Sequence, residues 1–476
     1  MTEIHDLTAI QQVTAVRRRE LSPVEITEHY LARIERLNDR VGAYITVAAE
    51  QARRQARLAE QRLVSGPPDD RPPALLGLPV PIKDLDMVAG LPWTRGSGLF
   101  AGQRAPEDEA FVARLRHAGA VFIGKTNTPE FGLPCYTENE IAPPARTPWD
   151  LTCSAGGSSG GAAAAVAAGL APVAQGSDGG GSIRIPASVC GLFGIKPSRG
   201  RVSAAPRRSD LLGLATTGPL ARTVRDAALL LDALAVSVPG DHYTAPALPG
   251  GRTFLEQADR DPGRLRVARF SAPPVSGVRP HPDVLAAYES ATALLSGLGH
   301  DVEEIDTPFD DTLFALFEEV WAGLASAAPV PPGAEDRLQP ITRWLRERAD
   351  RSSIRAFLTA AAGLQQAVRA ALPRLAAYDA VLTPTLASPP VPVGHFTAGG
   401  PAQEYRAMVD FTPYTSMYNV TGQPAVNVPL HVDGAGRPIG VMLAGRPGDE
   451  ATLIALSAQL EAARPWHGRT PRIWSA

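Results

Sequence analysis

The sequence predicts an α/β fold, with helices on both faces of a β-sheet. From about residue 75 onward, short apolar segments typical of strands alternate with longer amphipathic segments typical of helices. The first of these are a strand over residues 80–82, a helix over 108–118 and a strand over 121–123. The composition, 44% apolar and 20% charged, is sufficient for a large core.

The first 65 residues are predicted to be helical. Apolar residues at positions 7, 10, 13 and 16 form one stripe. Ser22 to Glu25 forms a capping box with proline at the first helical position, so a second helix is expected to run from there toward Asn38. Residues 47–64 are a third helical stretch, which ends at a Gly-Pro-Pro sequence.

The second half of the chain continues the α/β pattern after a connector. Residues 236–262 are rich in proline, glycine and aspartate, which is typical of a long connecting segment. Residues 310–377 are helical in pattern. The other predicted elements are strands at 265–270, 380–382, 425–430 and 440–443, and helices at 282–298 and 450–462.

Charge and cysteine content exclude several classes of protein. The formal net charge is −3, and no basic patch of the kind that binds nucleic acid stands out. Three isolated cysteines favour a reducing compartment, and no signal peptide or membrane-spanning run is recognisable, so we expect a cytoplasmic protein without membrane or nucleic-acid partners. The sequence leaves open whether the protein forms a homodimer.

Neither a metal nor an organic cofactor is expected. The nine histidines form no HxH or HxxxH pair, and the cysteines form no CxxC pair. No GxGxxG sequence follows a strand and opens a helix, so a dinucleotide site has no support either.

Three segments carry the candidate chemistry. Residues 80–84, VPIKD, place Lys83 at the end of an apolar strand, and residues 156–161, GGSSGG, lead directly into an alanine-rich helix. Residues 176–186, GSDGGGSIRIP, form a glycine-rich loop. Taken singly, these segments could be a surface lysine, a flexible linker and a phosphate-binding loop. The loop, however, lacks the Gly-Lys-Ser/Thr sequence of a P-loop.

Taken together, the three segments resemble the amidase signature family in residue type, order and spacing. That family has a strand lysine, then a GGSSGG stretch, then a serine in a Gly-Gly-Ser-Ile-Arg loop. Ser158 and Ser182 are 24 positions apart, as in the family motif. The resemblance extends over nearly the whole chain, and includes GKTN at 124–127 and GLFGIKP at 191–197. It implies one amidase domain over residues 1–476, with a central mixed β-sheet and a catalytic core at 75–235.

The resemblance also implies a catalytic relay of Lys83, Ser158 and Ser182. A serine hydroxyl is a weak nucleophile without a base, and no histidine lies in a triad signature. A lysine can act as that base when it is neutral, which burial in an apolar strand favours. In the family, Ser182 would attack the amide, and Ser158 would pass its proton to Lys83 and later to the departing amine. The Gly157–Ser158 peptide bond would be cis.

Glycines and charged residues around Ser182 suggest further roles. The backbone N–H groups of Gly179, Gly180, Gly181 and Ser182 could form an oxyanion hole. Asp178 and Arg184 are expected to support this loop, and Ser159 to position Lys83. Two departures from the family, Ser-Asp-Gly at 177–179 and the proline-rich segment 141–149, affect the predicted shape of the pocket and not its reacting groups.

Aromatic residues near the expected pocket hint at an apolar or aryl amide substrate. Candidates come from three regions: residues 132–137, the variable helical region 310–377, which could determine substrate choice, and residues 411–418. They are Tyr136, Phe317, Trp321, Phe411, Tyr414 and Tyr418. An equally weighted alternative is that several of these side chains pack in the core.

Two enzyme functions remain open. The first is a stand-alone hydrolase of small amides; residues 176–203 look most like bacterial hydrolases of cyclic nylon oligomers. The second is the glutamine-hydrolysing A subunit of the tRNA-dependent amidotransferase, which typically carries an Asp-Gln or Asp-His pair where this chain has Thr216-Thr217. A binding protein on a retired enzyme scaffold is disfavoured, because Lys83, Ser158 and Ser182 are all intact.

Overall fold

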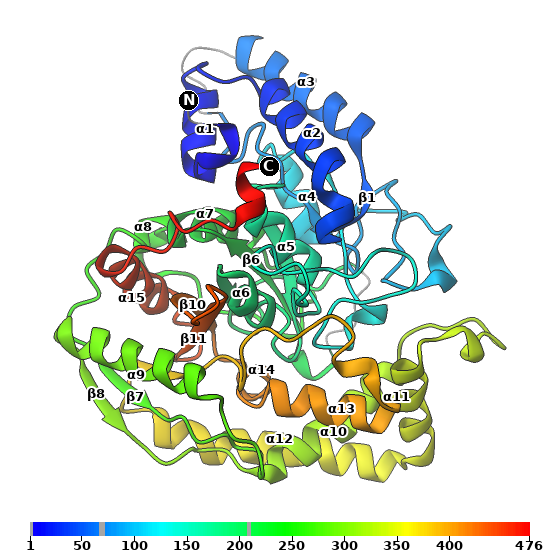
Figure 1. The fold of residues 1–476 in the computed structure, drawn as a ribbon, viewed down its shortest axis with the longest axis vertical. Helices are drawn as coiled ribbons and strands as arrows, with labels where there is room; N and C mark the ends of the chain where they lie inside the picture. Colours follow the sequence, from blue (N-terminus) through cyan, green and yellow to red (C-terminus); the bar gives the residue numbers. More distant parts are fainter. Residues whose placement is uncertain (1–2, 66–71, 207–210) are drawn as a thin grey trace.

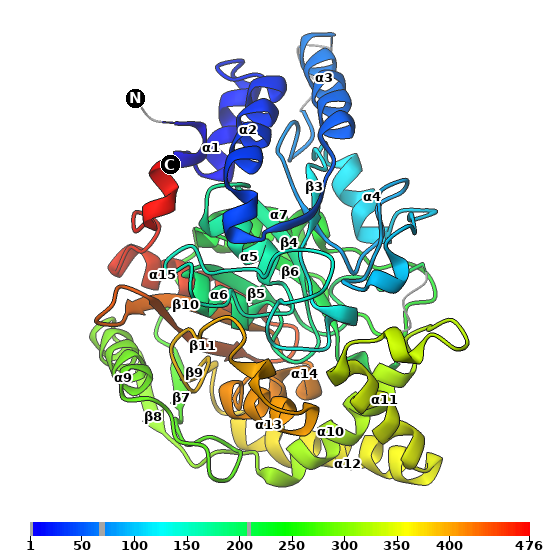
Figure 2. The same cartoon turned by 45° about the vertical axis from the view of Figure 1, so that its right-hand side comes forward.

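The computed structural model describes residues 3–65, 72–206 and 211–476. Eight strands form one sheet in the order β4-β6-β5-β10-β11-β9-β7-β8 (Figures 1 and 2). In that spatial order, the strands are Val173–Asp178, Thr216–Ala221, Phe193–Lys196, Ala425–Val432, Pro438–Gly445, Ala380–Pro384, Arg266–Arg269 and Asp301–Glu304.

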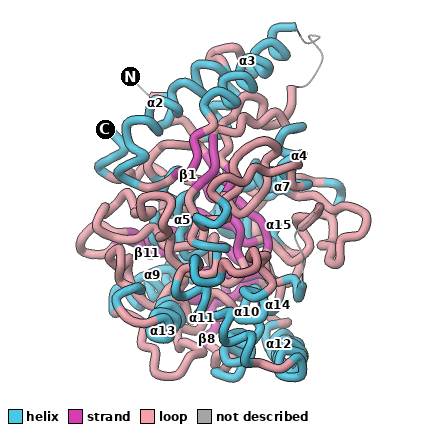
Figure 3. The backbone as a smooth tube through the Cα atoms, turned by 90° about the vertical axis from the view of Figure 1, so that its right-hand side faces the viewer, coloured by secondary structure: helices cyan, strands magenta, loops and turns pink. Residues whose placement is uncertain are grey.

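The sheet is mixed, as the family resemblance implied. Neighbouring strands from β4 to β9 pair antiparallel, whereas β7 pairs parallel with both β9 and β8. Every residue of β4, β6, β9 and β11 is buried. The predicted strands β9 and β11 are short apolar runs, whereas β4 (VAQGSD) and β6 (TTGPLA) carry polar side chains and were not predicted. The strands run through the middle of the molecule with helices on either side (Figure 3).

Helices cover both faces of the sheet, so the predicted α/β architecture is confirmed. On one face, α7 (Val224–Leu234), α9 (Pro282–Gly297) and α15 (Glu450–Ala463) pack on the inward-facing residues of β5, β10 and β11. On the other face, α5 (Gly160–Ala167) and α6 (Arg184–Cys190) are fully buried. The short helices α4 (Ala110–His117) and α8 (Phe254–Gln257) also contact α7.

The N-terminal region contains the predicted helices and one strand that was not predicted. The helices are α1 (Ala9–Arg17), α2 (Pro23–Val41) and α3 (Ala49–Ser65). At the start of α2, the Ser22 Oγ accepts hydrogen bonds from the N–H groups of Val24 and Glu25 at 3.0 and 3.1 Å, so the capping box is confirmed.

A second, three-stranded sheet has the order β1-β3-β2. Its strands are Tyr44–Val47, Gly124–Thr126 and Ile82–Lys83. The predicted third helix therefore begins two residues late, after β1, and the strand predicted at 121–123 lies at 124–126 instead. Pairing with distant segments, which local pattern does not report, decides both differences.

The helical region predicted at 310–377 forms one end of the molecule, opposite α2 and α3 (Figures 1 and 2). It consists of α10 (Asp311–Ser326), α11 (Pro340–Arg351) and α12 (Ile354–Leu375). These helices pack with α13 (Pro401–Phe411) and α14 (Met417–Thr421).

Single-turn 3₁₀ helices occupy several connections. They are η1 (Ile4–Asp6), η2 (Gly98–Phe100), η3 (Glu130–Gly132), η4 (Leu211–Gly213), η5 (Pro249–Gly251), η6 (Glu335–Arg337), η7 (Phe396–Ala398) and η8 (Arg472–Ser475). The connector predicted at 236–262 is thus not wholly irregular, since it contains η5 and α8. Among the helices of the described ranges, none combines the length and apolar character needed to cross a bilayer.

Candidate active site

Lys83 lies at the end of β2 among three serine hydroxyls. Its side chain is completely buried. The Nζ atom is 2.7 Å from the Oγ of Ser158, 3.0 Å from that of Ser159 and 3.1 Å from that of Ser177. The lysine is therefore held in a polar pocket inside an apolar strand environment, as the sequence predicted, with a hydroxyl of the serine pair as its nearest partner.

The serine pair immediately precedes α5 and is held by the neighbouring strand β4. The Ser159 Oγ donates to the carbonyl of Ser177 at 3.1 Å and accepts from the N–H of Ser177 at 3.2 Å. The peptide bond between Gly157 and Ser158 is cis, as the resemblance implied. The contacts of Ser159 with both Lys83 and β4 are consistent with the positioning role predicted for it.

Ser182 lies beside the serine pair, in the loop between β4 and α6. Its carbonyl oxygen accepts a hydrogen bond from the N–H of Ser159 at 3.2 Å. Its side chain is 8% exposed and lines the apolar cavity described below. The fold thus brings Lys83, Ser158 and Ser182 from three separate segments to one place, with Ser182 at the wall of that cavity.

The glycine loop before Ser182 is held by Asp178. The Asp178 carboxylate accepts hydrogen bonds from the N–H of Gly181 at 2.8 Å and from the N–H of Ile183 at 3.1 Å. The Gly181 N–H is therefore not available to an oxyanion, which removes Gly181 from the predicted set of donors. Within the described part of the chain, the N–H groups of Gly179, Gly180 and Ser182 donate to no other group.

Arg184 pairs with Asp178 beneath this loop. The guanidinium makes two hydrogen bonds of 2.9 Å to the carboxylate, and both side chains are fully buried. Burial alone would raise the pKa of Asp178, but the adjacent Arg184 charge holds that pKa well below its usual value. Asp178 is consequently ionised and acceptor-only, which suits the supporting role predicted for this pair.

Two residues that the sequence did not single out complete this support. Asn419 on α14 donates to the Asp178 carbonyl at 2.9 Å and accepts from Arg184 at 2.7 Å. The Thr415 hydroxyl donates to the carbonyl of Gly180 at 2.6 Å. Their nearest sequence signal was the stretch 411–418, which the prediction used only for its aromatic residues.

An apolar cavity of about 410 Å³ opens over Ser182. The rings of Phe317 and Trp321 on α10 stack at 5.4 Å between centroids. A Cβ added at Gly179 would lie 3.4 Å from the Trp321 ring, so this aromatic wall contacts the glycine loop. The remaining lining comes mainly from three places: Leu133, Pro134 and Cys135; Trp344 and Arg348 of α11; and Tyr405, Met408 and Val409 of α13.

Four of the predicted substrate-binding residues do not line this cavity. The rings of Phe411, Tyr414 and Tyr418 are packed in the core, where Tyr418 meets Phe309 edge-on. Tyr136 donates to Glu404 and lines a neighbouring depression. Trp321 and Phe317 are the predicted aromatics that do line the cavity. An aromatic side chain satisfies a core as well as a pocket, so residue type could not separate them.

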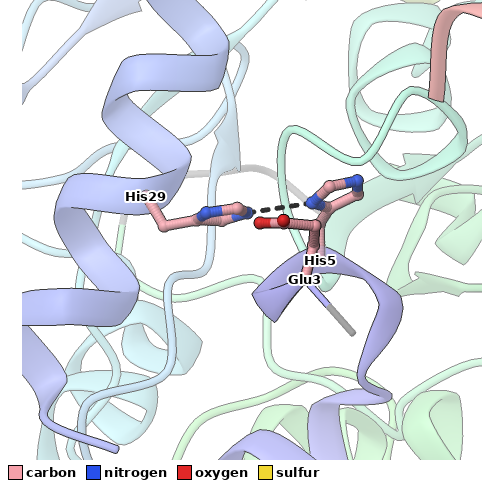
Figure 4. Close-up of side chains that lie close together, drawn as sticks. All are labelled: Glu3, His5 and His29. Atoms are coloured by element: carbon pink, nitrogen blue, oxygen red, sulfur yellow. Dashed lines mark hydrogen bonds between the residues drawn. The ribbon is translucent and has the colours of Figure 1, made fainter. Parts of the chain in front are cut away.

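Metal-binding potential is found away from this cavity. Among the described residues, one group of histidine and carboxylate side chains could hold a metal ion: Glu3, His5 and His29 (Figure 4). No metal site was expected from the sequence, because these residues follow no HxH or HxxxH spacing. The fold, and not the local sequence, brings them together.

Known proteins are similar to this chain over nearly its whole length. The sequence model of the Amidase family matches residues 25–454. The chain is 43% identical to AmiB2 of Mycobacterium tuberculosis over 99% of each chain. It is 36% identical to 6-aminohexanoate-cyclic-dimer hydrolase of Paenarthrobacter ureafaciens over 98% of this chain and 96% of that one.

The fold is similar to solved structures of the same kind. A structure of 6-aminohexanoate cyclic dimer hydrolase complexed with substrate superposes with a TM-score of 0.90 and 33% identity, over 99% of this chain and 100% of the other. A match of this extent in both sequence and structure shows common membership. The chain therefore belongs to the amidase signature family and is an enzyme that hydrolyses amide bonds.

Proposed function

We propose that the protein is a stand-alone amidohydrolase that cleaves a small-molecule carboxamide or secondary amide through an acyl-enzyme on Ser182. The observation that carries this proposal is the buried contact of 2.7 Å between the Lys83 Nζ and the Ser158 Oγ. The adjoining Ser159 N–H donates to the carbonyl of Ser182 at 3.2 Å and so holds the serine pair next to the Ser182 segment. A buried amine next to a hydroxyl is the arrangement needed for a lysine base and a serine relay.

In the first step, the neutral Lys83 amine accepts the Ser158 proton while Ser158 accepts the proton of Ser182. The Ser182 Oγ bonds to the amide carbon, and the carbonyl electron pair moves to its oxygen. The N–H groups of Gly179, Gly180 and Ser182 are the donors that we assign to this oxyanion. Asp178 and Arg184 would act indirectly, by holding the loop that presents these donors.

In the second step, the oxyanion collapses and the C–N bond breaks. The leaving nitrogen receives its proton from the Lys83 ammonium through Ser158, so the amine departs neutral. Water then attacks the ester on Ser182 by the same route, and releases the acid. No group outside this chain is needed to balance the protons.

The cavity supports a substrate with an apolar or aryl acyl group. The stacked rings of Phe317 and Trp321 form a flat apolar wall beside the glycine loop. Four charged residues, Asp311, Glu318, Arg348 and Arg406, also line the cavity, and Glu318 and Arg348 pair at 3.0 Å. One relative is a 6-aminohexanoate-cyclic-dimer hydrolase, and its name is consistent with a compact, weakly polar amide as the substrate of this chain as well.

The test uses the purified chain alone, with aryl anilides of increasing acyl length and with glutamine. We expect amine release from an anilide without tRNA, ATP or other subunits. Ser182→Ala and Lys83→Ala should each lower kcat by more than a thousandfold, and the double change should cost little more, because the residues act as one relay. Ser203→Ala, on a serine bonded to Asp241, is the matched control and should retain activity.

A fluorophosphonate should add once per chain to the wild type and not to Ser182→Ala, as read by mass spectrometry. Two results would overturn the proposal. Normal turnover by Ser182→Ala would show that Ser182 is not the nucleophile. Ammonia release from glutamine that appears only with added amidotransferase subunits would favour the second function.

A further inference from the structure

Three side chains converge where the two ends of the chain meet. Glu3 is the N-cap residue of η1, His5 lies within η1, and His29 comes from α2 (Figure 4). The His5 Nδ1 and the His29 Nε2 are 3.0 Å apart, and these nitrogens and a Glu3 carboxylate oxygen all lie within 4.8 Å of one another. Two imidazoles and one carboxylate are a ligand set that Zn²⁺ takes in proteins.

The hydrogen bond on the far side of His5 determines which of its nitrogens is free. The His5 Nε2 is 3.2 Å from the carbonyl oxygen of Trp474. A carbonyl can only accept, so Nε2 carries the proton and Nδ1 presents its lone pair toward His29. Metal-ligating histidines are typically held in this way, with the second ring nitrogen donating to a backbone carbonyl or a carboxylate.

The spacing of the two nitrogens also suits a metal ion. A tetrahedral zinc with bonds of about 2.0–2.1 Å to nitrogen separates two ligand nitrogens by roughly 3.3 Å. The observed 3.0 Å differs from this by a few tenths of an ångström, which a small rotation of the half-buried His29 ring can supply. A cavity of about 490 Å³, lined in part by Glu3, His5 and His29, leaves room for water as a fourth ligand.

Two nearby positive charges, those of Arg33 and Arg36, oppose a cation. The Arg33 guanidinium faces the same cavity, where it donates to the carbonyls of Ala168, Gly169 and Trp474 at 2.8–3.0 Å. Two carboxylates, Glu3 and Asp6, also face the cavity and offset these two positive charges. Because the positive and negative charges around the cavity offset one another, a divalent ion would be held by its bonds to the three ligands more than by the net charge of the site.

We propose that Glu3, His5 and His29 bind a first-row divalent cation of the Zn²⁺ type. The site would join η1 to α2 and, through Trp474, to the C-terminal η8 (Figures 1 and 2). It lies at the far end of α5 from the candidate active site, since His5 packs on Gly169 just after α5, whereas Ser158 and Ser159 precede that helix. Its role is therefore structural.

The proposal is tested with the full-length protein stripped by a chelator and dialysed, then titrated with Zn²⁺ by calorimetry. We expect one equivalent to bind the wild type and to raise the midpoint of thermal unfolding. His29→Gln and the surface substitution Glu3→Gln should each weaken binding at least tenfold. His117→Gln, on an exposed histidine of α4, is the control and should bind as the wild type does.

Titration with Co²⁺ supplies a second measurement, because its visible absorption reports histidine coordination directly. The same band should be lost in His29→Gln and kept in His117→Gln. The assignment is wrong if the wild type takes up no equivalent, or if the His29 and Glu3 variants bind Zn²⁺ as tightly as the wild type. Thermal unfolding of each metal-free variant shows whether it is folded.

Discussion

At the scale of single residues, Asp178 connects the fold to the chemistry. Its two carboxylate oxygens accept from the N–H groups of Gly181 and Ile183, on either side of Ser182, and from Arg184, and all of these groups are buried. A buried pair broken on one side leaves an uncompensated charge, which typically costs about 3–5 kcal/mol. The same side chain therefore supports both the stability of the protein and the geometry of the glycine loop.

Asp178→Asn is expected to lower the free energy of unfolding by about 3 kcal/mol, because Arg184 would be left buried without its counter-ion. It should also lower kcat more than it raises KM, because the loop presents groups that we assign to the transition state. Urea unfolding and steady-state kinetics measure the two effects. Glu347→Gln, which breaks an exposed pair with Arg351, is the control and should change stability by less than about 0.5 kcal/mol.

The depressed pKa of Asp178 also predicts how the stability difference between Asp178→Asn and the wild type changes with pH. A carboxyl whose folded pKa lies below its unfolded value contributes stability above the unfolded pKa. That contribution disappears as the pH falls through the folded pKa. Asp178→Asn should consequently differ most from the wild type near neutral pH and converge with it in acid. A stability difference that grew on acidification would contradict this role.

Individual residues also show what sequence could predict about the site. Lys83, Ser158 and Ser182 could be proposed together because each lies in a short segment whose residues are adjacent in sequence. The role of Asn419 could not, because its contacts with Asp178 span more than 200 positions. The hydrogen bond from the Gly181 N–H could not be predicted either, because it depends on where the Asp178 carboxylate points.

At the scale of secondary-structure elements, α10, α11 and α13 form much of the wall of the candidate substrate cavity. Each helix exposes one side to the cavity and buries the other, and the sequence reveals the amphipathic pattern without revealing what the apolar side faces. The strand β1 and the helix α8 were not predicted from the sequence. Both are short, and pairing or packing with distant segments determines them.

Trp321→Ala should raise KM for aryl anilides while the chain stays folded. Burying a large apolar side chain against a ligand is worth about 1.5–3 kcal/mol, which corresponds to roughly a 10- to 100-fold change. Tyr414→Phe is the matched control, because the Tyr414 ring lies in the core and not in the cavity wall. A larger effect on KM from Tyr414→Phe than from Trp321→Ala would show that the cavity is not the acyl site.

At the scale of the whole molecule, the distribution of basic residues is unusual. The chain has three lysines, Lys83, Lys125 and Lys196, and each is at most 1% exposed. The positive charge of the surface is therefore carried by arginine. Lys83 contacts the serines, and Lys125 forms a buried ion pair of 2.8 Å with Asp84. Lys196 donates to the carbonyl of Pro197 at 2.9 Å.

Burial, together with the nearby charge of Arg184, lowers the pKa of Lys196 to about 7. The unfolded chain would hold that proton up to a pKa of about 10.4. Between these two values the unfolded state binds more protons than the folded state, so this residue makes the protein more stable as the pH rises. Over the two pH units from 7 to 9, the contribution amounts to about 2 kcal/mol.

Lys196→Met removes this titration. Between pH 7 and pH 9, the unfolding free energy of the wild type should therefore rise by about 2 kcal/mol more than that of the variant. Urea unfolding at several pH values measures the difference, and changes in other groups cancel in the comparison. NMR of protein labelled at lysine gives an independent reading, because only three side-chain signals are present. The signal absent from Lys196→Met should titrate near pH 7. If that signal does not titrate up to pH 9, and the unfolding free energies of the two proteins change with pH in parallel, Lys196 keeps its proton in the folded protein. Burial beside Arg184 would then not lower its pKa.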